Sequence, residues 1–346
     1  MSVRAPGWGL LLCLLCGSAA SAAGAAGAGR LYVSDERGGE VVIIDAVRGI
    51  VSGRIAVGRR PRGIKLAPDG RQLYVALSGS AIAGPGVDES SLPPPDRRFD
   101  GIGVISIATG RLLRTLPGGT DPETLAVSPD GRTIYVANED AMRLSSIDVA
   151  SGALRASVAI GLEPEGVAVR PDGKVVYVTC EGSGAVYAID TAAMSVIAKI
   201  ATRPRPRAIV FARDGKSGFI SDEVGAAITV FDTATQQVLR TISLPASADT
   251  LMRPMGLATS PDGTSLYVTT GRGGALLEIE LHTYTLRRTM AAVGQRPWGV
   301  ALNTDGSKAY TANGPSGDIS IVDLATGRVE RRVPVGASPW GIVYTP

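Results

Sequence analysis

The sequence predicts an all-β, seven-bladed β-propeller whose last blade is closed by both ends of the chain. Two regularities point to this fold. The turn tripeptide Pro-Asp-Gly, or a near variant, recurs about every 42 residues, with its Asp at 69, 130, 172, 214, 262 and 305. A proline stands eight residues before each Asp, at 61, 122, 164, 206, 254 and 297. A fixed period of this length is typical of propellers and solenoids.

A third observation is that the two ends of the chain complement each other. Pro339 begins a further copy, and the chain stops at Pro346, where the next turn would start. The N-terminal runs Leu31–Glu36, Val41–Asp45 and Ile50–Val57 form a copy that lacks its opening strand. An open solenoid would need polar caps, whereas a closed ring leaves only short, protected edges. We therefore expect the C-terminal segment to complete the N-terminal blade.

Each copy is expected to form one blade of four antiparallel strands. In the clearest copy the strands should be Gly166–Arg170, Val175–Thr179, Ala185–Ile189 and Val196–Ile200. These runs are rich in β-branched and aromatic residues and are bounded by turn residues. Pro-Asp-Gly suits a tight turn because proline fixes φ, Asp bonds its own backbone and Gly accepts positive φ.

Residues 1–29 are predicted to be a signal peptide with a short linker, followed by the propeller at 30–346. Arg4 precedes an apolar run at 10–16 and then Ala20-Ser-Ala22, and this run is too short to span a membrane. Cleavage would leave Cys180 alone and no disulfide. We expect a bacterial protein of the periplasm or the cell surface, with no transmembrane segment in the mature chain.

The charge of the chain argues against nucleic-acid binding. The formal net charge is only +3, and no basic stripe is present. The Arg-rich piece Arg203–Arg207 is expected to be a solvated loop. We expect a monomer whose partner, a protein or a small ligand, binds the face that carries the long loops.

One face of the ring carries the positions that vary between copies. The first strand of each blade starts there, the second strand ends there, and the insertions Ser80–Asp100 and Ala246–Arg253 open there. Loops on a rigid scaffold often carry function. The residues that follow the prolines form one ring: Arg62, Glu123, Glu165, Arg207, Met255, Trp298 and Trp340. The ends of the second strands form another: Glu36, Ser78, Glu139, Glu181, Glu223, Gly271 and Gly314.

These rings give the channel mouth an acidic half and an aromatic half. Such a mouth suits a cationic or ring-shaped ligand, with cation–π contacts to the indoles. Alternatively, these positions face solvent and their residues vary without functional meaning, and Trp298 and Trp340 fill the channel. Clustered glutamates also allow Ca²⁺, but they lack a recognised calcium spacing, so no metal and no cofactor is predicted. No catalytic residue is assigned, because His282 is expected away from the mouth and nothing local activates Cys180.

Three strings that follow Asp-Gly turns carry a family resemblance: Leu73-Tyr-Val-Ala, Ile134-Tyr-Val-Ala-Asn138 and Val176-Tyr-Val-Thr. They resemble the YVTN-repeat β-propellers, and the resemblance covers roughly residues 30–346. Further pieces resemble the propellers associated with pyrroloquinoline quinone-linked catabolism, including Gly119-Thr-Asp-Pro-Glu123, Glu163-Pro-Glu-Gly166 and Pro339-Trp-Gly341. The insertion Ser80–Asp100 departs from them. The resemblance implies an exported accessory protein without established catalysis.

Three functions compete on the sequence. The leading hypothesis is a non-catalytic binding or scaffold protein, accessory to periplasmic quinone-dependent oxidation. The alternative is a lactonase-like hydrolase that uses Glu139, Glu181 or Glu223 together with Arg207 or a metal. This requires a base and an electrophile to converge in one pocket. A surface adhesin is the third possibility.

Overall fold

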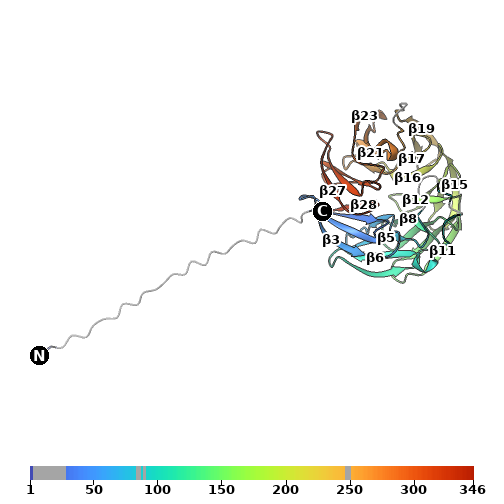
Figure 1. The fold of residues 1–346 in the computed structure, drawn as a ribbon. Helices are drawn as coiled ribbons and strands as arrows, with labels where there is room; N and C mark the ends of the chain where they lie inside the picture. The colour runs from blue at the N-terminus through green and yellow to red at the C-terminus, as the bar shows by residue number, and fades with distance from the viewer. Residues whose placement is uncertain (3–28, 83–86, 89–90, 246–250) are drawn as a thin grey trace.

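The computed structural model describes residues 1–2, 29–82, 87–88, 91–245 and 251–346. In these residues seven four-stranded antiparallel sheets are arranged as blades of a ring (Figure 1). The predicted all-β, seven-bladed propeller is confirmed. The described residues also include two short 3₁₀ helices, η2 (Arg97–Phe99) and η3 (Gly271–Gly273). None of their helices is long and apolar enough to cross a membrane.

The blades are numbered along the chain, and six of them consist of four consecutive strands. The first contains β4 (Ile64–Leu66), β5 (Gln72–Leu77), β6 (Gly101–Ser106) and β7 (Arg111–Leu116). The second contains β8 (Pro122–Val127), β9 (Thr133–Asn138), β10 (Arg143–Asp148) and β11 (Leu154–Ala159). The third contains β12 (Pro164–Val169), β13 (Val175–Cys180), β14 (Ala185–Asp190) and β15 (Ser195–Ala201).

The remaining blades continue around the ring. The fourth contains β16 (Pro206–Phe211), β17 (Ser217–Asp222), β18 (Ala227–Asp232) and β19 (Val238–Ser243). The fifth contains β20 (Leu257–Thr259), β21 (Ser265–Thr269), β22 (Leu276–Glu280) and β23 (Thr285–Met290). The sixth contains β24 (Pro297–Leu302), β25 (Lys308–Asn313), β26 (Asp318–Asp323) and β27 (Arg328–Pro334). The seventh joins β28 (Pro339–Thr345) to β1 (Arg30–Asp35), β2 (Glu40–Asp45) and β3 (Ile50–Ala56).

The strands expected for the third blade lie within two residues of the observed bounds. Their burial follows their place in the sheet. Every residue of β13 is buried between the neighbouring blades, whereas most of β15 is open to solvent at the rim. The apolar second strand of each copy therefore belongs to the buried core, and the fourth strand lies at the solvent-exposed surface.

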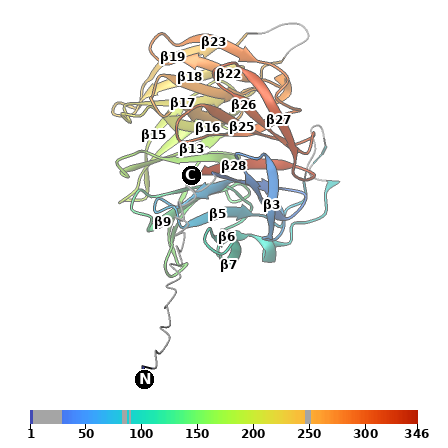
Figure 2. The same ribbon diagram turned by 90° about the vertical axis from the view of Figure 1, so that its left-hand side faces the viewer.

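The seventh blade closes the ring as the two chain ends predicted. β28 pairs antiparallel with β1, with Leu31 opposite Tyr344 and Val33 opposite Ile342. The Asp35 carboxylate accepts hydrogen bonds from the Ser338 amide at 2.7 Å and the Ala337 amide at 3.0 Å. Figure 2 shows β28 in red beside the blue N-terminal strands.

The apolar core of the described residues is divided among the blade interfaces. Seven clusters of buried side chains occur, each between one pair of neighbouring blades. One of them joins the seventh blade to the first through Tyr32, Ile55, Ile64 and Leu73. Because no interface lacks a cluster, the ring is sealed all the way around.

The outer edges of the blades are protected by positive charge. An unpaired strand edge invites association with another chain, and basic side chains discourage it. Every fourth strand carries at least one basic residue, namely Arg54, Arg111, Arg114, Arg155, Lys199, Arg240, Arg287, Arg288, Arg328, Arg331 and Arg332. Many of the arginines therefore lie on the outer strands of the blades.

The insertion Ser80–Asp100 joins β5 to β6 at the end of the second strand of the first blade, as expected. Residues 246–250 of the second insertion lie outside the described residues. So do residues 3–28, which contain most of the predicted signal peptide.

Candidate active site at the channel mouth

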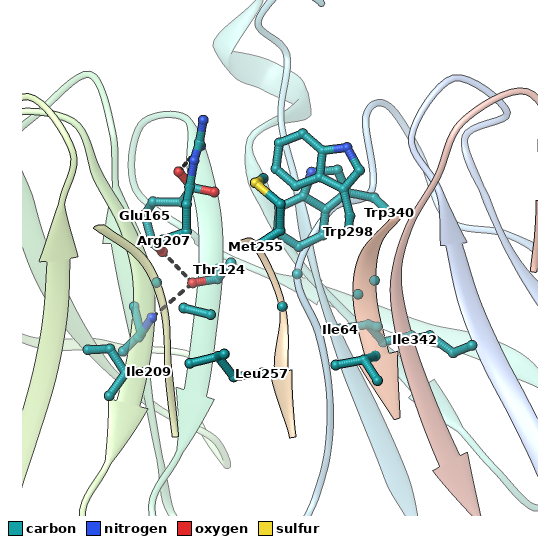
Figure 3. Close-up of a pocket in the computed structure, with 18 of the residues that line it drawn as sticks. Ile64, Thr124, Glu165, Arg207, Ile209, Met255, Leu257, Trp298, Trp340 and Ile342 are labelled. Carbon is teal, nitrogen blue, oxygen red and sulfur yellow. Dashed lines mark hydrogen bonds and ion pairs between the residues drawn. The ribbon is translucent and has the colours of Figure 1, made fainter. Parts of the chain in front are cut away.

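Most members of the two predicted rings line one open cavity of about 820 Å³ at the mouth of the central channel. They are Glu36, Arg62, Glu123, Glu139, Glu165, Glu181, Arg207, Glu223, Trp298, Gly314 and Trp340. Met255 lines a second cavity of about 140 Å³ deeper in the channel (Figure 3). A volume of about 300–1,000 Å³ is usual for a small-molecule site.

Hydrogen bonds between neighbouring blades fix the backbone of the ring that follows the prolines. Thr179 Oγ1 donates to the Arg207 carbonyl oxygen at 2.8 Å, and Thr269 Oγ1 donates to the Trp298 carbonyl oxygen at 2.7 Å. Ser34 bonds the Arg62 carbonyl oxygen in the same way, at 2.6 Å. In each case the hydroxyl belongs to the second strand of the preceding blade. The side chains at the mouth therefore extend from a rigid frame.

Three carboxylates converge on the guanidinium of Arg207 in β16. Its Nη1 contacts carboxylate oxygens of both Glu165 and Glu181. Its Nε and Nη2 each lie 2.7 Å from Glu223 Oε2. Arg205 adds a second cation, with Nε 2.6 Å from Glu181 Oε2. We call Glu165, Glu181, Arg207 and Glu223 the Arg207 cluster, and all four side chains are at most 10% exposed.

The cluster holds two of its carboxyl groups in opposite protonation states. Burial, reinforced by repulsion from the neighbouring Glu165, raises the pKa of Glu181 to about 9. Burial also opposes ionisation of Glu223, but the charge and hydrogen bond of Arg207 outweigh it and lower the pKa of Glu223. Two carboxyl groups whose pKa values are driven apart are characteristic of an acid–base pair. At neutral pH Glu181 can donate a proton and Glu223 can accept one.

A second arginine-centred group, the Arg62 cluster, lies at the same mouth. Arg62 Nη2 is 2.6 Å from Asp121 Oδ1, and its Nη1 contacts Glu123 and lies 3.6 Å from Glu139 Oε2. Burial raises the pKa of Glu139 to about 7. The Arg62 side chain is only 1% exposed, against 9% for Arg207. The Arg62 cluster thus ties the first blade to the second with little of its cation open to the cavity.

The two tryptophans stack on each other across two blades. The ring centroids of Trp298 and Trp340 are 5.5 Å apart at an interplanar angle of 26°. Both residues line the mouth cavity and the deeper cavity, so they lie between the two. The guanidinium carbons of Arg296 and Arg207 lie 4.8 and 5.4 Å from the Trp298 ring centroid. These cations of the protein itself take the place that we expected for a cationic ligand.

Sequence reasoning missed a third ring, formed by the residue before each proline. Arg60, Asp121, Glu163, Arg205 and Arg296 all line the mouth cavity. All five have left-handed backbone conformations, with φ between 46° and 58°. A residue before proline normally prefers extended backbone, and such strain often occurs at functional sites. The sequence does contain a signal for this third ring, since a charged residue precedes most of these prolines.

Other candidate groups stay out of the chemistry. Burial raises the pKa of Cys180 to about 12, so its thiol is a poor nucleophile. His282 is exposed in the turn after β22, away from the residues that line the mouth. In the described part of the chain no three His, Cys, Asp or Glu side chains are grouped so as to hold a metal ion. Arginines occupy the centres of both carboxylate clusters instead.

Solved structures of similar shape include proteins of several descriptions. The periplasmic gluconolactonase of Pseudomonas aeruginosa is 22% identical, with a TM-score of 0.75 over 92% of this chain and 99% of that one. A candidate 6-phosphogluconolactonase of Bacteroides fragilis is 17% identical, with a TM-score of 0.72 over 92% and 98%. Hydrazine synthase of Kuenenia stuttgartiensis is 20% identical, with a TM-score of 0.68 over 81% and 88%. These likenesses show the fold. Comparison with curated proteins gives no match.

The model of one protein family, described as lactonase, 7-bladed beta-propeller, matches residues 164–337, just over half of the 346-residue chain. The matched segment contains the whole Arg207 cluster and Trp298. Our leading expectation of a non-catalytic binding or scaffold protein is therefore wrong. The sequence distributed the carboxylates around a ring, whereas side-chain packing brings three of them onto one guanidinium. The chain belongs to the lactonase family of seven-bladed β-propellers.

Proposed function

We propose that the protein hydrolyses a lactone at the Arg207 cluster. The observation that carries this proposal is the convergence of Glu165, Glu181 and Glu223 on Arg207 in the wall of an open cavity. It supplies a base, an acid and an electrophile within one site. The Arg62 cluster has similar chemistry, but it lies outside the segment that matches the lactonase family.

Each group has a defined part in the reaction. Glu223 as carboxylate takes a proton from water, and the water oxygen adds to the lactone carbonyl carbon. The negative charge that develops on the carbonyl oxygen is stabilised by Arg207. A guanidinium has five N–H donors, and the contacts with the described carboxylates leave one N–H of Nη2 for that oxygen. The ring C–O bond then breaks, Glu181 protonates the leaving oxygen, and a hydroxy acid is released. Glu223 then gives its proton to solvent and Glu181 takes one from solvent, which restores the site.

The surroundings of the cluster suit a neutral ester that acquires charge. The four side chains are almost fully buried, and the stacked indoles lie beside them between the mouth cavity and the deeper cavity. Electrostatic stabilisation is stronger where water is excluded. Arg272 and Arg296 also line the cavity without an ion pair to any described residue, so they are available to hydrogen-bond substrate oxygens.

Hydrolysis of δ-lactones, followed by acid release at constant pH, tests the proposal. Glucono-δ-lactone, δ-valerolactone and their alkylated relatives should be opened faster than by buffer alone. Glu223→Gln keeps the shape of the site and removes the base, and it should lower kcat by about 10²–10⁴. His282→Gln, which changes an exposed turn residue, serves as the matched control. Equal activity of Glu223→Gln and the wild type would contradict the assignment.

We propose further that the protein works in the periplasm. A predicted signal peptide at residues 1–29 supports this, as does the description of one structural relative as periplasmic. N-terminal sequencing of the protein from the periplasmic fraction should place the mature end between residues 22 and 30. The Tyr-Val-Ala strings support membership of the YVTN-repeat group, a matter of repeat type that leaves the lactonase assignment unchanged.

A further inference from the structure

The described residues of the insertion Ser80–Asp100 form part of the wall of the mouth cavity, and hydrogen bonds anchor the two ends of the insertion. The Asp100 carboxylate accepts hydrogen bonds from the Gly79 amide at 2.7 Å and the Asp121 amide at 3.1 Å. Arg97 contacts Asp140 on the second blade. The Asp96 amide donates to the Gly79 carbonyl oxygen at 3.0 Å. The described part of the insertion is therefore held against two neighbouring blades.

The described side chains that the insertion presents to the cavity are largely apolar. Ile82, Val87 and Leu92 line it, together with two residues of the stiff Pro93-Pro94-Pro95 run. Val87 is 44% exposed, and Ile82 and Leu92 are half-buried. Apolar surface left open to water in a cavity favours a ligand that covers it. We call Ile82, Val87 and Leu92 the apolar wall.

The apolar wall faces the Arg207 cluster across the ring. Its members belong to the first blade. The Arg207 cluster comes from the third and fourth blades, and in a ring of seven no blade is further from the first than the fourth. The Trp298 ring contacts the cluster itself, since its centroid lies 5.4 Å from the Arg207 guanidinium carbon and the ring stacks on Trp340 (Figure 3). A lactone whose carbonyl meets Arg207 thus directs its far substituent towards apolar side chains.

We infer that the substrate is a lactone with an apolar substituent, an alkyl chain of several carbons, rather than a fully hydroxylated sugar lactone. This inference rests on the proposed hydrolysis at the Arg207 cluster. The cluster recognises the ester group, which every lactone has. The apolar wall then discriminates between lactones. A substrate hydroxyl placed against it loses its hydrogen bonds to water and gains none from the wall. A methylene placed there is released from water instead.

The test compares δ-valerolactone, δ-hexalactone, δ-octalactone and δ-decalactone with glucono-δ-lactone. For the wild type we expect kcat/KM to rise about fourfold per methylene over the first members of the series, the factor that full burial of each CH₂ implies. Ile82→Ser combined with Leu92→Ser should lower the ratio of kcat/KM for δ-decalactone to that for δ-valerolactone by about tenfold. Leu113→Ser, on the exposed outer strand of the same blade, should leave this ratio unchanged. Val87→Ser is a second variant, since its side chain is already largely in solvent.

Binding of the matching alkyl δ-lactams, which resist hydrolysis, separates this inference from the proposed function. If no lactone is opened but longer lactams raise Tm more, and the serine variants abolish that trend, the apolar wall stands and the hydrolase proposal fails. If lactones are opened with no dependence on chain length, or with the same dependence in the serine variants, the inference is overturned and the hydrolase proposal stands. A preference of the wild type for glucono-δ-lactone also overturns it.

Discussion

Replacing Arg207 by Met is the most informative single change, because the chain offers a matched control in Arg62→Met. Both arginines are buried, both contact three carboxylates, and both border the same cavity. Methionine keeps the length and apolar stem of the side chain and removes its charge. Only Arg207 is assigned a part in the chemistry. The two variants should therefore agree in stability and differ in activity.

The stability cost follows from the charges that are left behind. The Glu223 side chain is 10% exposed, so its carboxylate cannot recover its hydration when the guanidinium is removed. Removing one partner of a buried ion pair costs about 3–5 kcal/mol, and we expect a loss in this range for each variant. Without the cation, burial raises the folded-state pKa of Glu223 above its unfolded value. The folded protein then binds more protons than the unfolded one, and the variant loses stability as pH rises. The loss should be larger at pH 8 than at pH 4.5.

The activity cost follows from the lost stabilisation of the oxyanion. Removing one such donor lowers kcat by about 10²–10³, so Arg207→Met should fall by this factor or more. Arg62→Met should keep kcat within a few-fold of the wild type. Urea unfolding measures the first effect, and acid release from δ-lactones at 15 °C below the lower Tm measures the second.

Two results would refute this reasoning. If Arg207→Met hydrolyses lactones as fast as the wild type, the cluster is structural. If Arg62→Met loses activity while Arg207→Met keeps it, the reaction takes place at the Arg62 cluster, with Glu139 as the base.

Three further predictions follow from the site and the ring. Glu181→Gln should lower kcat by about 10²–10⁴. In the wild type, kcat should fall as pH rises through about 9, where Glu181 loses its proton, and this fall should be absent in the variant. If the variant shows the same fall of kcat at high pH, Glu181 is not the acid. Gly166→Ala should lower kcat about 10²-fold at temperatures where the variant is still folded, because a Cβ there overlaps the Arg207 carbonyl oxygen and a shift of about 1 Å can cost 10²-fold in rate. Gly173→Ala changes a left-handed glycine in the turn between β12 and β13, at the opposite end of these strands; an equal loss of kcat there would argue against positioning. Deletion of Ser338–Pro346 removes β28, the partner of β1. The folding free energy lost should exceed the net stability of a typical domain, about 5–15 kcal/mol, so that no cooperative thermal transition remains. A truncated protein that melts like the full chain would disprove the closure.

The amino-acid sequence by itself determined the number of blades, the positions of the strands and the split seventh blade. These features are local and periodic, since each copy carries its own turn, proline and four apolar runs. They also place Arg207, Glu165, Glu181 and Glu223 on the same face of the ring. The prediction of a functional mouth with an acidic half and an aromatic half rests on the same regularity.

The tertiary structure decided which of these side chains meet. Glu165 and Glu181 come from the third blade and Arg207 and Glu223 from the fourth, so their contact depends on ring curvature and side-chain direction, which no repeat encodes. The left-handed backbone before the prolines, which adds Arg205 and Arg296 to the mouth, is likewise invisible in a strand pattern. Burial raises the pKa of Glu181 and Arg207 lowers the pKa of Glu223, and this separation turns a ring of ordinary acidic residues into a candidate acid–base site.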